Sequence, residues 1–228
     1  MQLKDIVGEL QTIYNSKLAE DWDNVGLLIG HENSEVNTIL LCLDITEEVV
    51  DKAIKGKVDL IISHHPFIFS GLKRITSETV HGRKMLKIIE NKIAVYSGHT
   101  NVDFGINGLN DYIFYKLDLN GKVEIYNEFE YEDYNFIKQR NQHVKGGTVR
   151  IKVLDYEMEL LDLIKIIKEK LGLNFIRYVG ENRKIHKIGL VTGGGSSFMH
   201  SVKENIDVFL TGDLRYHEAL DTLEEGGI

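Results

Sequence analysis

Residues 58–66 read Val58-Asp59-Leu60-Ile61-Ile62-Ser63-His64-His65-Pro66 and join an apolar run to two adjacent histidines. The run predicts a buried strand, and Pro66, the only proline of the chain, favours extended geometry at His65. Ligand-binding residues of open α/β sheets gather at the carboxyl ends of strands, and neutral imidazole is the commonest protein ligand for zinc and its neighbours. The stretch therefore predicts a strand that ends in a metal site.

The adjacency of His64 and His65 favours a centre with two metal ions. Consecutive side chains of an extended segment point to opposite faces, so the two imidazoles would reach two ions, or one ion and its water. The alternative interpretation is a surface loop or a capping role. Imidazole ligands favour zinc, manganese or iron, because calcium takes six or more oxygen ligands.

A second apolar run supports the metal interpretation. Residues 92–98 predict another strand, which leads directly into His99-Thr100-Asn101-Val102-Asp103. Asp103 is a hard oxygen donor able to bridge two cations, and His99 could bind a metal or orient another ligand. The alternative for Asp103 is the cap of a helix suggested by residues 108–113.

Alternating strands and helices predict an α/β fold for the first half of the chain. An amphipathic helix with apolar positions at Ile6, Leu10, Ile13 and Tyr14 comes first. After it we predict strands at 25–29, 38–43, 58–63 and 93–97 and helices at 46–55 and 79–91. This order is typical of parallel βαβ units.

The second half predicts a similar α/β lobe. We expect strands at 148–153, 174–179, 186–192 and 206–210 and helices at 157–171 and 197–204. Between the halves the pattern dissolves into a polar, acidic segment. The expected architecture is therefore two α/β lobes, forming layered mixed sheets flanked by helices, over residues 1–117 and 148–228, with a connecting segment at 118–147.

Four further residues are candidates for lining a substrate cleft: Asn24, Asp44, Gly194 and Ser196. Asn24 follows Trp22 in a loop where a packed Trp with Asx-turn partners is the alternative. Asp44 ends the predicted strand 38–43 and either caps the next helix or faces the cleft. The glycine loop 193–197 either forms a tight turn or offers backbone N–H groups to a phosphate.

Composition excludes several protein classes. With 228 residues, 43% hydrophobic and 27% charged, the chain has the make-up of a globular protein. Its net charge of −8 argues against nucleic-acid binding, which needs a basic surface. The single cysteine, Cys42, excludes an intrachain disulfide and predicts a buried strand residue. No apolar run approaches the roughly 18 residues of a membrane helix, and no secretory signal opens the chain. We therefore expect a cytoplasmic protein without a membrane partner.

Four ordered segments make the chain similar to the type 2 GTP cyclohydrolase I-like proteins, also called NIF-three-like. The segments are residues 18–27, Ser63-His64-His65-Pro66, His99 to Asp103, and Thr211-Gly212-Asp213-Leu214-Arg215-Tyr216-His217-Glu218. The resemblance covers nearly the whole chain. It implies a centre of two divalent ions whose first three ligands correspond to His64, His65 and Asp103, and a toroidal homohexamer.

One part of the family pattern is missing from this sequence. The last two family ligands belong to a Gly-His-x-x-x-Glu segment beyond the Thr-Gly-Asp motif, and the sequence ends at Ile228 without it. His217 and Glu218 do not replace that pair, because adjacent residues do not reproduce its helical i, i+4 spacing. We therefore expect a chain shortened by a few tens of residues, with a partial metal shell.

These residues predict hydrolysis by metal-activated water, with His99 or His217 moving protons. The resemblance adds a named candidate reaction, opening of the purine ring of GTP, and hence a small-molecule, nucleotide substrate. The alternative is a non-catalytic metal-handling or regulatory scaffold. A base-specific pocket would separate the two functions.

Overall fold

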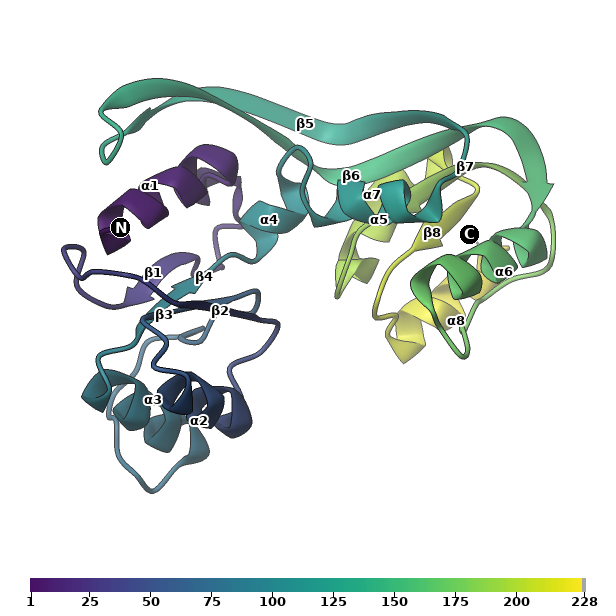
Figure 1. The fold of residues 1–228 in the computed structure, drawn as a ribbon. Coiled ribbons are helices and arrows are strands. Elements are labelled where there is room, and N and C mark those ends of the chain that lie inside the picture. The colour runs from purple at the N-terminus through teal and green to yellow at the C-terminus, as the bar shows by residue number, and fades with distance from the viewer. Residues whose placement is uncertain (227–228) are drawn as a thin grey trace. The chain divides into compact units, whose positions relative to one another are not determined.

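The structure is a computed structural model in which residues 1–226 are described (Figure 1). The chain forms two compact units, the first containing residues 1–102 and 131–144 and the second containing residues 103–130 and the chain from 145 onward. Each unit holds a four-stranded mixed sheet with helices against it. The prediction of layered mixed α/β sheets is therefore confirmed.

The sheet of the first unit has the strand order β1-β4-β3-β2. Strands β2, β3 and β4 run parallel to one another, and β1 is antiparallel to β4. The register aligns Cys42 with Ser63 and Ser63 with Ser97, so the three parallel strands end at the same level. Residues that follow these strands therefore meet at one edge of the sheet. The strands are β1 (Gly26–Ile29), β2 (Ile39–Cys42), β3 (Leu60–Ser63) and β4 (Ala94–Ser97).

Helices cover both faces of this sheet, because strand side chains alternate between the faces. In β3, Leu60 packs in the cluster that includes α1, whereas Ile61 packs in the cluster that includes α2 and α3. Figure 1 shows α1 on one side of the strands and α2 with α3 on the other. The helices are α1 (Leu3–Ile13), α2 (Glu47–Lys55) and α3 (Val80–Glu90), with a short 3-10 turn at Ser16–Leu18.

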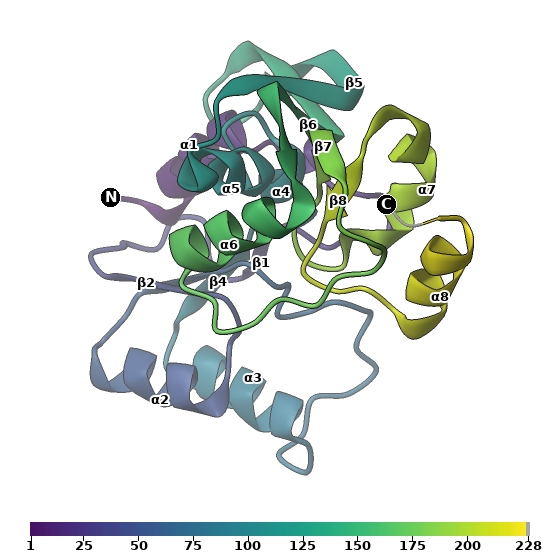
Figure 2. The ribbon, with the colours of Figure 1, turned by 90° about the vertical axis from the view of Figure 1, so that its right-hand side faces the viewer.

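The sheet of the second unit has the order β5-β6-β7-β8. Strand β6 is antiparallel to β7, and β7 is parallel to β8. In Figure 2 the strands β6, β7 and β8 lie side by side, with α5 and α6 on one side and α7 on the other. The strands are β5 (Gly121–Asn135), β6 (Arg140–Glu159), β7 (Lys184–Leu190) and β8 (Val208–Leu210).

The remaining helices range from 4 residues in α7 to 12 residues in α6. Helix α4 spans the point where the first unit passes into the second, and α5 to α8 belong to the second unit. Within residues 1–226 no helix combines the length and the apolar character needed to cross a membrane. The helices are α4 (Thr100–Phe104), α5 (Leu109–Leu117), α6 (Leu160–Leu171), α7 (Met199–Val202) and α8 (Tyr216–Glu224), with 3-10 turns at Gly195–Phe198 and Lys203–Asn205.

The predicted connecting segment 118–147 is instead most of a long hairpin formed by β5 and β6. Its acidic stretch alternates Phe129 and Tyr131 with the glutamates at 128, 130 and 132, and such a period of two is compatible with a strand. The compact units also divide the chain differently from the expected lobes, because residues 131–144 of the hairpin join the first unit and residues 103–117 join the second.

The predicted strand 174–179 is absent from the described structure. Strand β7 pairs directly with β6, up to Glu159 opposite Lys184, so the segment before β7 has no place in the sheet. The side chain of Phe175 is accordingly 73% exposed. The predicted helix 157–171 begins only at Leu160 for the same reason, since the residues before it complete β6.

Arg150 is the largest fully buried side chain of the second unit. Its guanidinium donates to the Asp111 carboxylate and to the carbonyl oxygens of Phe104, Gly105 and Gly147. A buried charge is tolerated only when it is paired and fully hydrogen-bonded. Arg150 therefore ties the segment from α4 to α5 to strand β6.

Replacing Arg150 tests this tie. We expect Arg150→Met to lower the free energy of unfolding by about 3–5 kcal/mol, because it removes the guanidinium that pairs with the Asp111 carboxylate and donates to three carbonyl groups. Urea denaturation followed by circular dichroism measures the change. Arg140→Met is the matched control, since Arg140 is exposed and its loss should change stability by less than about 0.5 kcal/mol. Equal stability of the two variants would contradict the assignment.

Candidate metal centre

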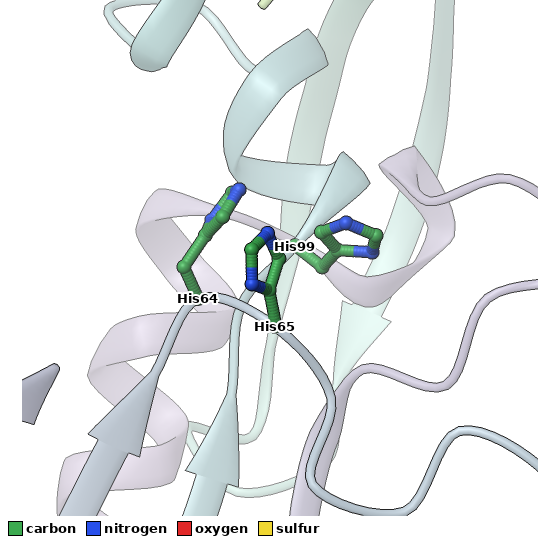
Figure 3. A group of neighbouring side chains, drawn as sticks. All are labelled: His64, His65 and His99. Atoms are coloured by element: carbon green, nitrogen blue, oxygen red, sulfur yellow. The ribbon is translucent and has the colours of Figure 1, made fainter. Parts of the chain in front are cut away.

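Three histidines come together at the edge where the parallel strands end. His64 and His65 follow β3, and His99 follows β4 after Gly98. One ring nitrogen of each histidine lies within 4.8 Å of one from each of the other two (Figure 3). Because β3 and β4 are in register at Ser63 and Ser97, the residues after them are brought level.

The histidine pair does not follow strict strand alternation. Strand β3 ends at Ser63, and the ring centroids of His64 and His65 lie 5.2 Å apart, so both side chains turn to the same place. The expectation that they point to opposite faces is wrong, because residues 64 and 65 form a bend rather than a pleated strand. Hydrogen bonds from His64 N to Cys42 O and from His65 N to Leu43 O hold this bend to the end of β2.

Each imidazole has an acceptor at Nδ1. His64 Nδ1 lies 2.9 Å from Gly98 O, and His65 Nδ1 lies 2.8 Å from Asp44 Oδ1. His99 Nδ1 lies 3.0 Å from both carboxylate oxygens of Asp23. Carbonyl and carboxylate oxygens only accept, so Nδ1 carries the proton and the lone pair of each neutral ring lies on Nε2. Metal-binding histidines are held in this way by their outer-shell partners.

The Asp23 carboxylate accepts hydrogen bonds from both His99 and Thr100. Its side chain has no exposed surface. Burial raises the pKa of Asp23, but hydrogen bonds from His99 and from the Thr100 side chain and backbone outweigh it, and the pKa falls to about 2. Asp23 therefore remains ionised and fixes the orientation of the His99 ring. Asp23 lies within the motif segment 18–27 but was not predicted as a site residue. An acid in one motif paired with a histidine in another was the signal available in the sequence.

The structure excludes one of the two interpretations of Asp44, the helix cap. Helix α2 is capped by Thr46, whose hydroxyl accepts from Val49 N, so Asp44 does not supply this cap. The Asp44 carboxylate instead accepts from His65. Asn24, another predicted cleft residue, donates from its side-chain amide to Ile68 O and so ties its loop to the segment after the histidines.

An exposed aromatic pair lies beside the histidines. The Trp22 ring centroid is 6.1 Å from that of His99 and 5.9 Å from that of Phe69. Trp22 is 56% exposed and Phe69 is 57% exposed. Trp22 is therefore largely exposed rather than packed in the core.

The other predicted site residues belong to the second unit. Asp103 is buried inside α4 and accepts from Thr192 Oγ1 at 3.0 Å. The cap residue of α5 is Gly108, so the alternative role of Asp103 as a helix cap does not apply. His217 is exposed in the first turn of α8, where its ring meets Tyr216 edge-on. The assignment of Asp103 as a ligand and of His217 as a proton carrier stays a prediction.

The glycine loop contains the last two candidates. Ser196 is buried, and its hydrogen bond lowers the pKa of Glu218 in α8. Gly194 has open space where a Cβ would lie, so no close approach explains a glycine there. Their role in a cleft stays a prediction.

The Nδ1 partners predict the tautomer of each histidine. At pH 8, metal-free protein should have the Nδ1–H form of His64, His65 and His99 in long-range ¹H–¹⁵N spectra. Asp23→Asn should convert His99 alone to the Nε2–H form, because an amide can present its NH₂ group to Nδ1. Asp21→Asn is the matched control, since Asp21 is exposed and should leave all three tautomers unchanged. An Nε2–H form of His99 in the unmodified protein would contradict the hydrogen-bond assignment.

Comparison with known proteins identifies the family of this chain. A sequence model of the family Duf34/NIF3 (NGG1p interacting factor 3) matches residues 1–228. A Clostridium perfringens protein named GTP cyclohydrolase 1 type 2 homolog is 36% identical over 228 residues, covering 99% of this chain and 82% of that protein. A protein of the same name from Clostridium acetobutylicum is 34% identical, and the aligned region covers 97% of this chain and 79% of that protein.

Solved structures agree with the sequence relatives. The crystal structure of a hypothetical protein from Staphylococcus aureus superposes with a TM-score of 0.86 at 33% identity, covering 100% of this chain and 84% of that one. A Bacillus cereus protein related to NIF3 superposes with a TM-score of 0.83 at 25% identity, covering 99% of this chain and 86% of that one. The chain belongs to the Duf34/NIF3 family.

Proposed function

We propose that this protein is a metal-dependent hydrolase that holds divalent transition-metal ions through Nε2 of His64, His65 and His99. The observation that carries the proposal is the set of three Nδ1 acceptors, Gly98 O, Asp44 and Asp23. These acceptors direct all three lone pairs to Nε2, in a group whose ring nitrogens lie within 4.8 Å of one another. A chance surface cluster of histidines would have no reason to share one tautomer.

The donor set fits zinc, manganese or iron. Imidazole suits these borderline metals, whereas calcium requires six or more oxygen ligands. Two ions are proposed, with Asp103 as the carboxylate ligand that the motif predicts. When bound, such ions lower the pKa of water towards ~7 and stabilise a developing oxyanion. The chain itself contributes the orientation of the rings, through Asp23 and Asp44.

The roles of His99 and His217 differ in this proposal. The Asp23 carboxylate accepts from His99 Nδ1, and one ring nitrogen of His99 lies within 4.8 Å of a ring nitrogen of His64 and of His65, so we assign His99 to metal binding. His217 is the remaining candidate for proton transfer. Ring-opening hydrolysis of GTP is the first reaction to test, because the relatives carry that name. A metal-handling scaffold is the alternative function.

Metal binding can be followed through Trp22, the only tryptophan of the chain. Its ring lies 6.1 Å from that of His99, so paramagnetic Co²⁺ at the histidines should quench its fluorescence. We expect saturable quenching, which the His64→Ala substitution should abolish. The Asp44→Ala substitution removes only the hydrogen-bond partner of His65 and should weaken the affinity for Co²⁺ by about 10–100-fold. His31→Ala is the matched control, since His31 is exposed outside the group. Unchanged quenching in His64→Ala would contradict the site.

Turnover separates the hydrolase from the scaffold. Protein loaded with zinc, manganese or iron should consume a substrate from a panel of nucleotides and simple esters, measured by chromatography of the products. The activity should disappear in His64→Ala and persist in His31→Ala. Stoichiometric metal binding without turnover of any compound in the panel would favour the metal-handling scaffold.

We also propose that the chain forms a homo-oligomer, with the hexamer implied by the resemblance as the expected state. The exposed pair Trp22 and Phe69 supports this proposal, because monomers seldom leave adjacent large aromatic side chains in water. Light scattering should give a mass several times the 26.0 kDa of one chain. A 26.0 kDa species at micromolar concentration would contradict it.

The cytoplasmic location also stays a prediction.

A further inference from the structure

Strand β2 is an edge of the sheet in the first unit, and no strand within residues 1–226 pairs with its outer side. On the inner side Cys42 O accepts from His64 N, so Cys42, and with it Leu40, directs its backbone groups to β3. Backbone groups alternate in direction along a strand. The N–H and C=O groups of Ile39 and Leu41 therefore point away from the sheet, towards a neighbour.

The side chains of β2 are covered on one face of the sheet only. Leu40 and Cys42 pack against the cluster that includes α2 and α3. On the opposite face Ile39 is 44% exposed, Leu41 is 74% exposed and Leu43, the residue after the strand, is 60% exposed. The cluster beneath α1 contains side chains from β1, β3 and β4 and, among the described residues, none from β2. Helix α1 thus leaves an apolar stripe open at this edge.

A pocket of about 250 Å³ lies between α1 and this stripe. Leu10 of α1 and Tyr14 at its end line one side, and Leu41 and Ile62 line the side of the sheet. Cavities of ~150 Å³ are known to admit benzene, so the pocket has room for an apolar side chain. A strand placed beside β2 would bring its own apolar side chains next to this pocket.

The other edges of the two sheets carry features that oppose pairing with a further strand. Sheet edges are commonly protected by a bulge, by charged side chains, by proline or by a very short strand. Strand β1 has a shift of register between Leu27 and Ile29, β5 carries glutamates along its length, and β8 has only 3 residues. Residues 36–43, in contrast, contain no proline and no charged side chain. Among the described edges, β2 is the one without such protection.

A second copy of the same chain fits this edge. The chain has a net charge of −8, so two copies repel one another over much of their surfaces. A two-fold axis places the same patch of both copies face to face, and an uncharged patch then meets no repulsion. Antiparallel pairing of β2 with itself is also self-complementary, because each outward N–H group meets an outward carbonyl group.

We propose that β2 pairs antiparallel with β2 of a second copy about a two-fold axis at Leu40, which joins the two sheets into one. Ile39 of one copy then lies opposite Leu41 of the other, and their outward backbone groups bond to each other. The stripes of the two copies lie side by side on the face that carries α1. This contact rests on the homo-oligomer proposed above, and it specifies one interface within that assembly.

Paired charges at the opposed positions test both the contact and its register. The double variant Ile39→Lys with Leu41→Lys places lysine opposite lysine. The matched double variant Ile39→Lys with Leu41→Glu places each lysine opposite a glutamate of the other copy. We expect the dissociation constant of the first to be about 10–100-fold weaker than that of the second. General charge repulsion predicts the reverse order, because two added lysines reduce the negative charge of the chain.

Sedimentation equilibrium of the chelator-treated, full-length variants at micromolar concentrations measures these constants, and circular dichroism verifies that both are folded. Equal dissociation constants for the two variants, in a protein that still associates, would overturn the β2 contact and leave the homo-oligomer standing. An unmodified chain that sediments as a monomer would overturn both. Because the protein is free of metal, neither outcome depends on the histidine site.

Discussion

The parallel register of β2, β3 and β4 is the constraint on which the candidate centre depends. Cys42, Ser63 and Ser97 occupy equivalent positions, so the three strands stop at one level. The segments that follow supply Asp44, the histidine pair and His99 at the same edge of the sheet. A shift of one residue in any strand would turn the side chains to the opposite face and separate these groups.

The chemistry of the centre comes from partners behind the histidines. An imidazole has two nitrogens, and only the one without a proton can bind a metal ion. Two carboxylates and one backbone carbonyl select that nitrogen in all three rings. Asp23 does this with a fully buried side chain, whose pKa is lowered despite burial by hydrogen bonds from His99 and Thr100, so it stays ionised. Such partners determine metal affinity alongside the ligands themselves.

The sequence by itself determined the elements nearest the histidines, because the apolar runs that form β3 and β4 and the residues that end them are neighbours in the chain. It also yielded the family and the α/β class. It did not determine the hairpin of β5 and β6, whose acidic alternation resembles a solvated linker. Only the tertiary structure decided how the histidines are held. Asp23 and His99 are 76 residues apart, and Asp44 and His65 are 21 apart, and such contacts depend on strand order across the sheet rather than on the pattern within one segment.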